Sequence, residues 1–417
     1  MRIVVLGAGV VGVTAAYELA SDGHEVVVVD RQDKAAMETS FSNAGMVSPG
    51  HAYTWASPRA PRILWDSLFR DDVALRLKLR PDLRMWMWCW RFLKECKAER
   101  AAINTGHKVR LCLYSQQRFA EIDRRHGFDY DRRVQGAIYV YRDHDHYERG
   151  VGAMNVLSDN GVTLRAVSTD EAVAIEPALA PDRANIAGAI HCPTDESGDC
   201  HRFTNAMAAY CAEKLGVTFH WSTNVTRVRA EGDQVVGVDT DRGALQADAY
   251  VLALGCYSPA IGRPLGIDLP VYPVKGYALT VPIEDHGGAP SMCGVDEKFL
   301  IAWTRLGQRL RVTATAEFNG FDRSLGERDL AHMTNTIRRL FPNGGAYEKA
   351  SRWAGLRPMT PKGTPILGRS PKRNLFLSTG HGHIGWTMSM GSGRILADII
   401  GGKQPDIDLT GMTLADA

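Results

Sequence analysis

The glycine pattern at residues 7–12, Gly-Ala-Gly-Val-Val-Gly, constrains the fold more than any other feature of the chain. It lies between an apolar run at residues 2–6 and a helical pattern at residues 10–22. A second β-branched run, at residues 25–29, ends at Asp30. This order of strand, glycine turn, helix and strand is typical of a Rossmann-type nucleotide-binding unit.

Each part of the pattern has a physical role. Gly7 permits the tight turn, Gly9 lets the backbone approach a pyrophosphate, and Gly12 allows the helix to pack closely on the strand. The N–H groups at the helix start, including those of Val10 and Val11, favour phosphate oxygens. Asp30 can accept hydrogen bonds from a ribose diol and argues against a 2′-phosphate, and therefore against NADP.

Two further segments favour FAD over NAD. Residues 38–46 carry hydroxyl groups at Thr39 and Ser40 that can bind phosphate, and small residues against which a flat ring can lie. Near the C-terminus a strand at 374–378 leads into the glycine-rich segment 379–386 and another helix. The N–H groups at that helix start can stabilise the anionic edge of a reduced flavin, a need that NAD enzymes do not have. FAD is therefore the predicted cofactor.

The rest of the chain predicts an α/β protein. We expect a Rossmann-like FAD-binding domain interleaved with an α+β substrate domain built on a mixed, mainly antiparallel sheet. The FAD-binding domain is expected to comprise residues 1–81, 196–270 and 346–417, and the substrate domain residues 82–195 and 271–345. The other expected helices cover 82–125, 202–215 and 327–341, and the other expected strands cover 136–142, 162–167, 217–220, 225–231, 234–240, 244–254 and parts of 271–315.

Composition excludes several classes. With 49 Lys and Arg against 47 Asp and Glu, the net charge of +2 gives no reason to expect a nucleic-acid partner. The eight cysteines form no C-x-x-C pair, so we expect no metal site and interpret them as buried free thiols of a reducing compartment. We see no export signal and no membrane-spanning run, and expect a cytoplasmic protein.

Several motifs together resemble the bacterial FAD-dependent D-amino acid dehydrogenases, within the D-amino acid oxidase and glycine oxidase group. Besides the glycine pattern, they are Thr39-Ser40 with Asn43-Ala44-Gly45, Asp195-Glu196-Ser197-Gly198-Asp199, Pro273-Val274-Lys275-Gly276-Tyr277, Gly355-Leu356-Arg357-Pro358-Met359-Thr360-Pro361 and Gly380-His381-Gly382. The resemblance covers essentially the whole chain. It implies oxidation of a D-amino acid to a 2-oxo acid and ammonia, with hydride passing from Cα to flavin N5 and electrons going on to a quinone or another acceptor.

The resemblance also assigns residues. Arg357, in a proline-stiffened segment, would bind the substrate carboxylate through its planar fork. Tyr277 and Tyr53 are candidates for a second contact or for the pocket wall, and His51 is expected near the flavin; none of them is assigned as a base. The expected cofactor-binding residues are Gly7, Gly9, Val10, Val11, Gly12, Asp30, Arg31, Thr39, Ser40, Asn43, Ala44, Gly45, Met46, Val225, Ala253, Gly255, Gly380, His381, Gly382, His383, Ile384, Gly385 and Trp386.

The chain departs from the family pattern at two places. Lys362 stands where the family usually has Asp, which affects the loop near Arg357. Thr313-Ala314 replaces a frequent glycine pair, which alters the expected pocket wall and leaves the exact substrate open.

An aromatic segment around Trp86, Trp88 and Trp90, flanked by Arg and Lys, has two interpretations. It is either a core helix of the substrate domain or an amphipathic surface on the inner face of the cytoplasmic membrane, where a quinone could take electrons. The family implies the second interpretation.

Three other functions remain open at this stage. A close rival is oxidation of a secondary amine such as hydroxyproline, proline or a sarcosine-like compound. A C-terminal cysteinyl flavin, found in some relatives of that class, is excluded because no cysteine follows Cys293. An NAD-dependent dehydrogenase and a non-catalytic flavin-binding protein are the alternatives of other classes.

Overall fold

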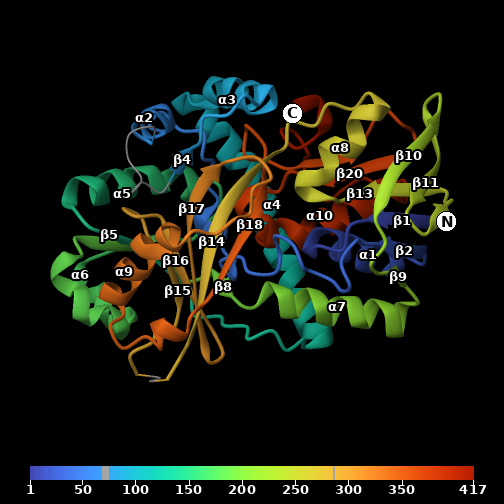
Figure 1. The fold of residues 1–417 in the computed structure, drawn as a ribbon. Coiled ribbons are helices and arrows are strands. Elements are labelled where there is room, and N and C mark those ends of the chain that lie inside the picture. The colour runs from blue at the N-terminus through green and yellow to red at the C-terminus, as the bar shows by residue number, and fades with distance from the viewer. Residues whose placement is uncertain (68–74, 285–286) are drawn as a thin grey trace.

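A computed structural model describes residues 1–67, 75–284 and 287–417. The expected domain ranges 1–81 and 271–345 therefore include two short segments, 68–74 and 285–286, that lie outside the described residues. Two large sheets dominate the described part of the chain, and the chain passes between them several times (Figure 1).

The first sheet is built on the predicted strand–helix–strand unit. Its central strand pairs in parallel with both of its neighbours, and only the strand at one edge is antiparallel. Across the sheet the six strands are β19 (Ile366–Arg369), β20 (Leu375–Thr379), β13 (Ala249–Leu252), β1 (Arg2–Leu6), β2 (Glu25–Val29) and β9 (Thr218–His220).

Both faces of this sheet are covered, as a parallel sheet requires. Ile3 and Val5 of β1 pack against a helical layer, while Val4 and Leu6 pack on the other side against a small antiparallel sheet. The helical layer consists of α1 (Val10–Ser21), α7 (Cys200–Leu215) and α10 (Gly385–Ile400). The small sheet consists of β10 (Val225–Glu231), β11 (Gln234–Thr240) and β12 (Gly243–Leu245), with α8 (Ser258–Gly262) nearby.

The second sheet has nine strands and is mixed, with two parallel pairs among otherwise antiparallel ones, as predicted. Its order is β18 (Ser351–Met359), β14 (Tyr272–Pro282), β17 (Arg309–Phe318), β16 (Ile301–Leu306), β15 (Cys293–Asp296), β5 (Ala137–Tyr141), β7 (Gly188–Cys192) and β6 (Arg165–Val167), and β4 (Leu75–Leu77) pairs with β17. One face packs on α6 (Thr169–Ile175) and α9 (Ala331–Leu340).

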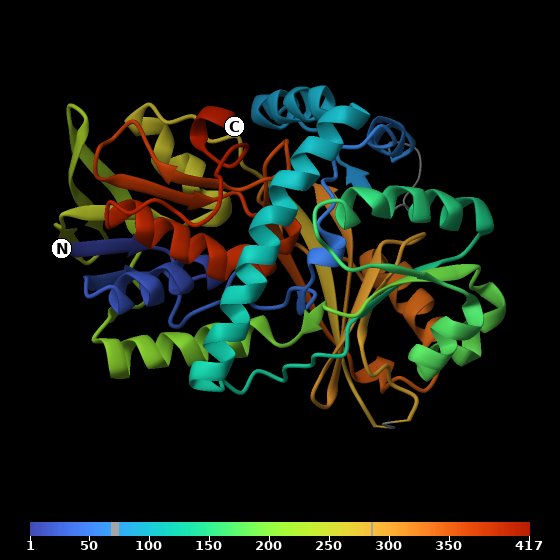
Figure 2. The ribbon, with the colours of Figure 1, turned by 180° about the vertical axis from the view of Figure 1, so that it is seen from behind.

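The remaining elements connect the two halves. The long helix α4 (Ala98–His126) crosses the back of the molecule and packs against α10 (Figure 2). Short strands β3 (Met46–Val47) and β8 (Glu196–Ser197) pair with each other. The other helices are α2 (Ala60–Asp66), α3 (Leu83–Glu95) and α5 (His144–Ser158).

Three predicted elements differ in the structure. The single helix expected at 82–125 is two helices, because α3 ends at Glu95 and α4 begins at Ala98. The single strand expected at 244–254 is split between β12 and β13, which belong to different sheets. The helix expected at 327–341 begins as a 3-10 turn, Glu327–Leu330, and becomes α-helical at Ala331.

The domain ranges stay a prediction, and sheet membership departs from them at two strands. β4 and β18 lie in ranges assigned to the FAD-binding domain but join the nine-stranded sheet. β18 thereby places Arg357 on the nine-stranded sheet.

Candidate active site

A cavity of about 1270 Å³ lies between the two large sheets. It exceeds the roughly 300–1,000 Å³ of an ordinary small-molecule pocket, as a dinucleotide together with a substrate would require. The predicted site residues that line it are Gly7, Gly9, Val10, Val11, Asp30, Arg31, Thr39, Ser40, Asn43, Ala44, Gly45, Met46, His51, Tyr53, Val225, Ala253, Gly255, Tyr277, Arg357, Gly380, His381, Gly382, His383, Ile384, Gly385 and Trp386.

Gly12 does not line the cavity. A Cβ atom there would overlap the carbonyl oxygen of Gly7, so Gly12 serves the close packing of α1 on the turn. Gly7 itself has φ +106°, and its Cβ would lie 2.7 Å from Ala253 O. At Gly9, by contrast, the nearest atom to an added Cβ would be Ser40 Oγ, 3.6 Å away, so its open side faces the cavity.

Asp30, the residue expected to bind a ribose, is held in place by the main chain. Its two carboxylate oxygens accept hydrogen bonds from the N–H groups of Ala8 (2.6 Å) and Gln32 (2.8 Å). Burial raises the pKa of Asp30. Arg31 lies beside it, with its guanidinium 4.0 Å from the ring centre of Tyr257.

The hydroxyl groups of Thr39 and Ser40, both predicted to bind phosphate, differ in their hydrogen bonds. Thr39 donates its hydroxyl proton to Leu356 O at 2.6 Å, so this hydroxyl holds the loop against β18, contrary to the phosphate-binding role expected for it. Ser40 Oγ accepts from the N–H of Val10 at 3.1 Å, which leaves its proton available to a phosphate oxygen. Asn43 also serves the loop, because its Oδ1 accepts from the N–H of Gly45 at 3.0 Å.

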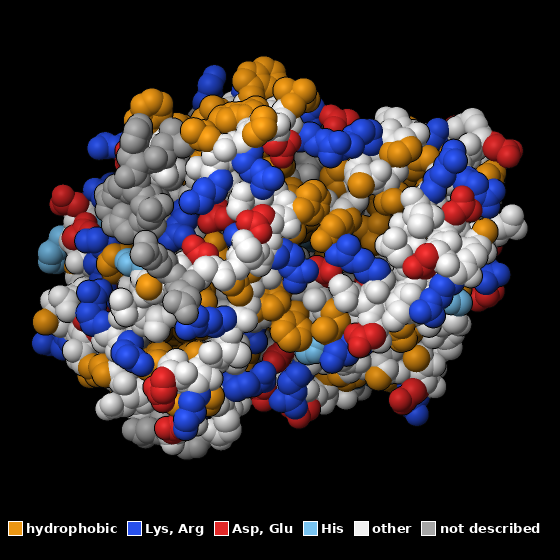
Figure 3. All heavy atoms as spheres, viewed as in Figure 1, with side chains coloured by type: hydrophobic (Ala, Val, Ile, Leu, Met, Phe, Trp, Pro, Cys, Tyr) orange, Lys and Arg blue, Asp and Glu red, His pale blue; other side chains and the backbone are white. Residues whose placement is uncertain are grey.

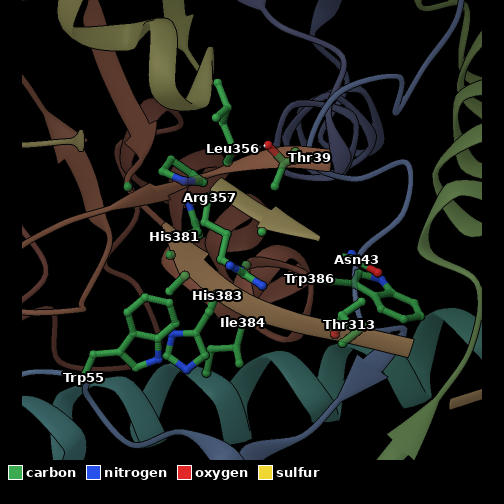
Figure 4. A pocket seen from close by; sticks show the side chains of 18 of the residues that line it. Thr39, Asn43, Trp55, Thr313, Leu356, Arg357, His381, His383, Ile384 and Trp386 are labelled. Atoms are coloured by element: carbon green, nitrogen blue, oxygen red, sulfur yellow. Dashed lines mark hydrogen bonds between the residues drawn. The ribbon is translucent and has the colours of Figure 1, made fainter. Parts of the chain in front are cut away.

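The glycine-rich segment before α10 lines another part of the cavity, where the flavin is expected to bind. Gly380 and Gly382 adopt φ values of +75° and +64°, which favour glycine, and α10 begins without a side-chain cap. His381 does not offer its ring to a ligand: the ring Nε2 pairs with Ser392 Oγ at 2.9 Å, and burial lowers its pKa to about 3. Trp386 lies across the cavity from Trp55 (Figure 4).

These features fit FAD. The start of α1, where Gly9 supplies no side-chain cap and Ser40 takes the N–H of Val10, suits the dinucleotide together with the open approach at Gly9 and the carboxylate of Asp30. The uncapped start of α10 suits a flavin edge that becomes anionic on reduction. Bound at these residues, FAD would supply a two-electron acceptor.

Arg357 is the charged group that faces the centre of the cavity. Figure 4 shows its guanidinium between the Trp55–His383 pair and Trp386. The guanidinium donates to Thr315 O at 2.7 Å and lies 5.9 Å from the ring centre of Trp55. Burial lowers its pKa to about 10, and within the described residues it forms no ion pair. A partly desolvated cation without an anionic partner favours binding of an anion.

The neighbouring strands make room for this side chain. Gly276 of β14 faces Arg357, and a Cβ atom there would overlap the guanidinium. In β17 the register shifts opposite Lys275 and Tyr277, and Thr315 adopts φ +63° in this bulge. Bulges re-aim groups next to active sites, and here the bulge carbonyl accepts from Arg357.

Tyr277 lines the cavity, which is one of its two expected roles, but its side chain is on the face of β14 opposite to Arg357. Successive residues of a strand point to opposite faces, so Gly276 shares the face of Arg357 and Tyr277 points to the other. Its hydroxyl donates to Glu317 at 2.9 Å, inside the core formed with α9.

His51 and Tyr53 do lie in the cavity wall. His51 Nδ1 is 3.6 Å from Glu297, and burial lowers the pKa of His51 to about 4. Burial raises the pKa of Tyr53, with a contribution from the charge of Glu297. The sequence does not mark Glu297 or Trp55 as site residues, because a single acid after a short strand and a lone Trp in a loop carry no motif.

The two departures from the family pattern lie in different places. Lys362 donates to the main-chain oxygen of Asp416 and fastens the C-terminal segment rather than a pocket loop. Thr313 and Ala314 line the cavity, so this departure does change its wall. The segment Asp195–Asp199 is structural: Asp195, for example, accepts from the N–H of Gly50 at 3.0 Å.

Comparison with known proteins matches residues 2–399 to the family of FAD dependent oxidoreductases. The chain belongs to this family. It is 46% identical to a D-amino acid dehydrogenase of Bradyrhizobium diazoefficiens, over 99% of this chain and 98% of the relative. It is 45% identical to one of Paramagnetospirillum magneticum, over 99% and 98% respectively. The resemblance seen in the motifs is confirmed.

Solved structures agree on the fold. Glycine oxidase from Geobacillus kaustophilus superimposes with a TM-score of 0.76 at 24% identity, covering 99% of this chain and 98% of that one. L-proline dehydrogenase from P. horikoshii gives 0.76 at 20% identity, covering 99% and 96%. The chain is thus an FAD-dependent oxidoreductase with this fold, and the NAD-dependent alternative is not supported.

Two further expectations can be compared with the structure. All eight cysteines lie in the described residues, and all are buried and free, as predicted. Among the helices of residues 1–67, 75–284 and 287–417, none has the length and apolar character needed to cross a bilayer.

Proposed function

We propose that the protein is a D-amino acid dehydrogenase, which oxidises D-amino acids to 2-oxo acids and ammonia with FAD as the electron acceptor. The observation that carries the proposal is Arg357, a partly buried guanidinium that faces the cavity and has no carboxylate partner among the described residues. A substrate carboxylate would supply that partner through two parallel hydrogen bonds. The names of the curated relatives support the same substrate class.

The proposed reaction depends on how Arg357 orients the substrate. With its carboxylate on Arg357, the substrate would present its Cα–H bond to the flavin held before α10. The amine gives up a proton and the Cα–H bond gives up a hydride, which leaves an imine that water hydrolyses to the 2-oxo acid and ammonia. The electrons then pass to a quinone or another acceptor. In this proposal the cofactor is bound by the cavity-lining residues predicted for it, with Thr39 and His381 contributing structure rather than side-chain contacts.

Anaerobic mixing tests the function. D-amino acids are expected to bleach the flavin absorbance of the holoenzyme and to release one ammonia per flavin reduced, while the L-enantiomers leave it unchanged. Bleaching by proline or sarcosine without ammonia release would instead establish the secondary-amine alternative. A flavin that no amine reduces would establish a non-catalytic flavoprotein.

We further propose that α2 and α3 dock on an anionic membrane surface, where a quinone is accessible. Both interpretations of the aromatic segment, a core helix and an amphipathic surface, apply to α3. One side of this helix packs in the core and the other side is exposed. Trp88 is 3% exposed and donates to Met359 O at 2.9 Å. On the outer side, together with Trp65 of α2, exposed apolar residues gather beside Lys and Arg (Figure 3). They are Leu79, Leu83, Trp86, Met87, Trp90 and Leu93.

This composition favours a lipid interface. Trp is suited to the boundary between headgroups and acyl chains, and basic residues add attraction to anionic lipids. Lys94, for example, lies over the ring of Trp90 at 3.2 Å from its centre. An exposed apolar patch of this extent is unusual for a protein surface that meets only water.

Replacing Trp90, which is 58% exposed, with Glu is expected to weaken binding to vesicles that contain anionic phospholipid about tenfold, because burying an aromatic side chain contributes on the order of 1.5–3 kcal/mol. Cosedimentation with vesicles measures this. Val134→Glu, at a residue 58% exposed and far from α3 in the chain, is the matched control and should bind as the wild type does. Equal recovery of wild-type protein in the supernatant with and without vesicles would exclude the membrane contact.

A further inference from the structure

The wall of the cavity beyond Arg357 carries polar groups for which the protein provides no partner. His51 Nδ1 and His383 Nδ1 are both buried without a hydrogen bond among the described residues. The Glu297 carboxylate lies 3.6 Å from His51 Nδ1, and 17% of its side chain is exposed, towards the cavity that it lines. Buried polar groups almost always find partners, so the two unpaired imidazole nitrogens, with a partly exposed carboxylate beside one of them, indicate that a ligand supplies partners at this wall.

This polar wall is separated from Arg357 by two rings. The guanidinium lies 5.9 Å from the centre of Trp55, and Trp55 stacks on His383 at 5.0 Å (Figure 4). His51 follows at 6.2 Å from His383, and Glu297 lies beyond it. Arg357 and Glu297 line the same cavity, so an amino acid whose carboxylate is bound at Arg357 would meet Glu297 with its side chain rather than with its α-amine.

Glu297 also differs from its neighbours in charge. Among the described residues that line the cavity, the other carboxylates are Asp30 and Glu38, at the nucleotide end. Burial and the nearby Lys108 keep the imidazole of His51 neutral, so His51 cannot balance the negative charge that Glu297 carries above about pH 8. Arg59, Arg149 and Lys298, which also line the cavity, are exposed, and Lys298 is paired with Asp143 at 3.6 Å. Solvent screens such exposed cations.

We propose that Glu297, with His51 beside it, is a specificity-determining residue that selects D-amino acids whose side chain ends in a positively charged nitrogen. The carboxylate pairs with the cation, and the neutral His51 Nδ1 can accept an N–H bond from it. This inference rests on the proposed function, since it requires the substrate carboxylate on Arg357. A site built for a polar group rejects an analogue that lacks it, because the polar residues are then left unpaired.

The test compares two substrates of equal chain length, D-lysine and D-norleucine, with the holoenzyme and an artificial electron acceptor. The wild type is expected to show kcat/KM at least about tenfold higher for D-lysine. Glu297→Gln, which keeps the size but loses the charge, is expected to remove most of this preference. Glu231→Gln, the same change at an exposed residue of β10, is the matched control and should keep it.

The pH dependence provides a second readout. Burial raises the pKa of Glu297 to about 8, and the titratable groups around it are His51, Tyr53, Tyr141 and Asp296. Lys108 of α4, whose ammonium lies 3.4 Å from His383 Nε2, also faces this wall, and burial lowers its pKa to about 7. A raised carboxyl pKa means that the group is neutral below that pH and charged above it. The ratio of kcat/KM for D-lysine over D-norleucine should therefore rise between about pH 7 and about pH 9, and the α-amine cancels from this ratio. In Glu297→Gln the ratio should be flat.

The outcomes separate this inference from the function on which it rests. If D-alanine reduces the flavin but D-lysine is not preferred over D-norleucine, or if Glu297→Gln keeps the preference, the role of Glu297 is wrong and the function stands. A preference for D-glutamate would likewise overturn the assignment of a cationic side chain. If no D-amino acid reduces the flavin, the proposed function itself fails.

Discussion

Arg357→Leu is expected to lower kcat/KM for D-amino acids at least about a hundredfold while the protein still binds FAD. Removing one partner of a desolvated charge pair costs about 3–5 kcal/mol, and about 1.4 kcal/mol corresponds to a factor of ten. The guanidinium is bonded only to Thr315 O in the described residues, so no ion pair of the fold is lost with it. Arg357→Lys should recover part of the activity, because an ammonium lacks the planar fork.

A structural role for Arg357 makes the opposite prediction. Leu would then cause poor folding or loss of flavin, and the holoenzyme that remains would turn over at nearly the wild-type rate. Flavin occupancy and kcat/KM measured on the same preparation distinguish the two. Gly276→Ala is an independent check: its Cβ would displace the guanidinium rather than the main chain, so we expect a raised KM with normal flavin content.

Gly9→Val is expected to yield folded protein without FAD. The side chain would occupy the space through which the pyrophosphate approaches the start of α1. The protein itself has room for it, because the nearest atom to a Cβ at this position is Ser40 Oγ at 3.6 Å. The ratio of flavin to protein absorbance measures the loss, and circular dichroism confirms the fold.

The same substitution elsewhere provides the control. At Gly152 of α5 no atom lies within 4 Å of the position that a Cβ would take, so Gly152→Val should retain FAD. Stoichiometric flavin in Gly9→Val would show that the pyrophosphate does not pass this residue.

The sequence by itself determined the local features that depend on neighbours in the chain. The turn at Gly7 and the glycines before α10 follow from backbone conformations that only glycine adopts easily. The strand that ends before Asp30 follows from its run of β-branched residues. Such patterns reveal a nucleotide-binding unit because all of its parts lie within a short stretch. Arg357 is predictable for a related reason, as its proline-rich motif is contiguous.

The tertiary structure decided which side chains face the cavity, because this depends on strand pairing between distant segments. Tyr277 lies one residue from Gly276, yet the alternation of β14 turns it into the core, while the pairing with β18 places Gly276 against Arg357. The sequence predicts that Thr39 binds phosphate through its hydroxyl, but Leu356, 317 residues away in the chain, accepts that proton.

Glu297 is the clearest example of a cavity residue that the sequence alone does not reveal. Nothing adjacent to it in the chain marks it as a site residue, and it meets His51 only because β15 pairs with β5 and the loop of residues 48–55 folds against them. Local patterns report backbone geometry, whereas the composition of a pocket wall arises from contacts between residues far apart in the chain. The cofactor could therefore be predicted from the sequence, and the side-chain specificity of the substrate site required the assembled structure.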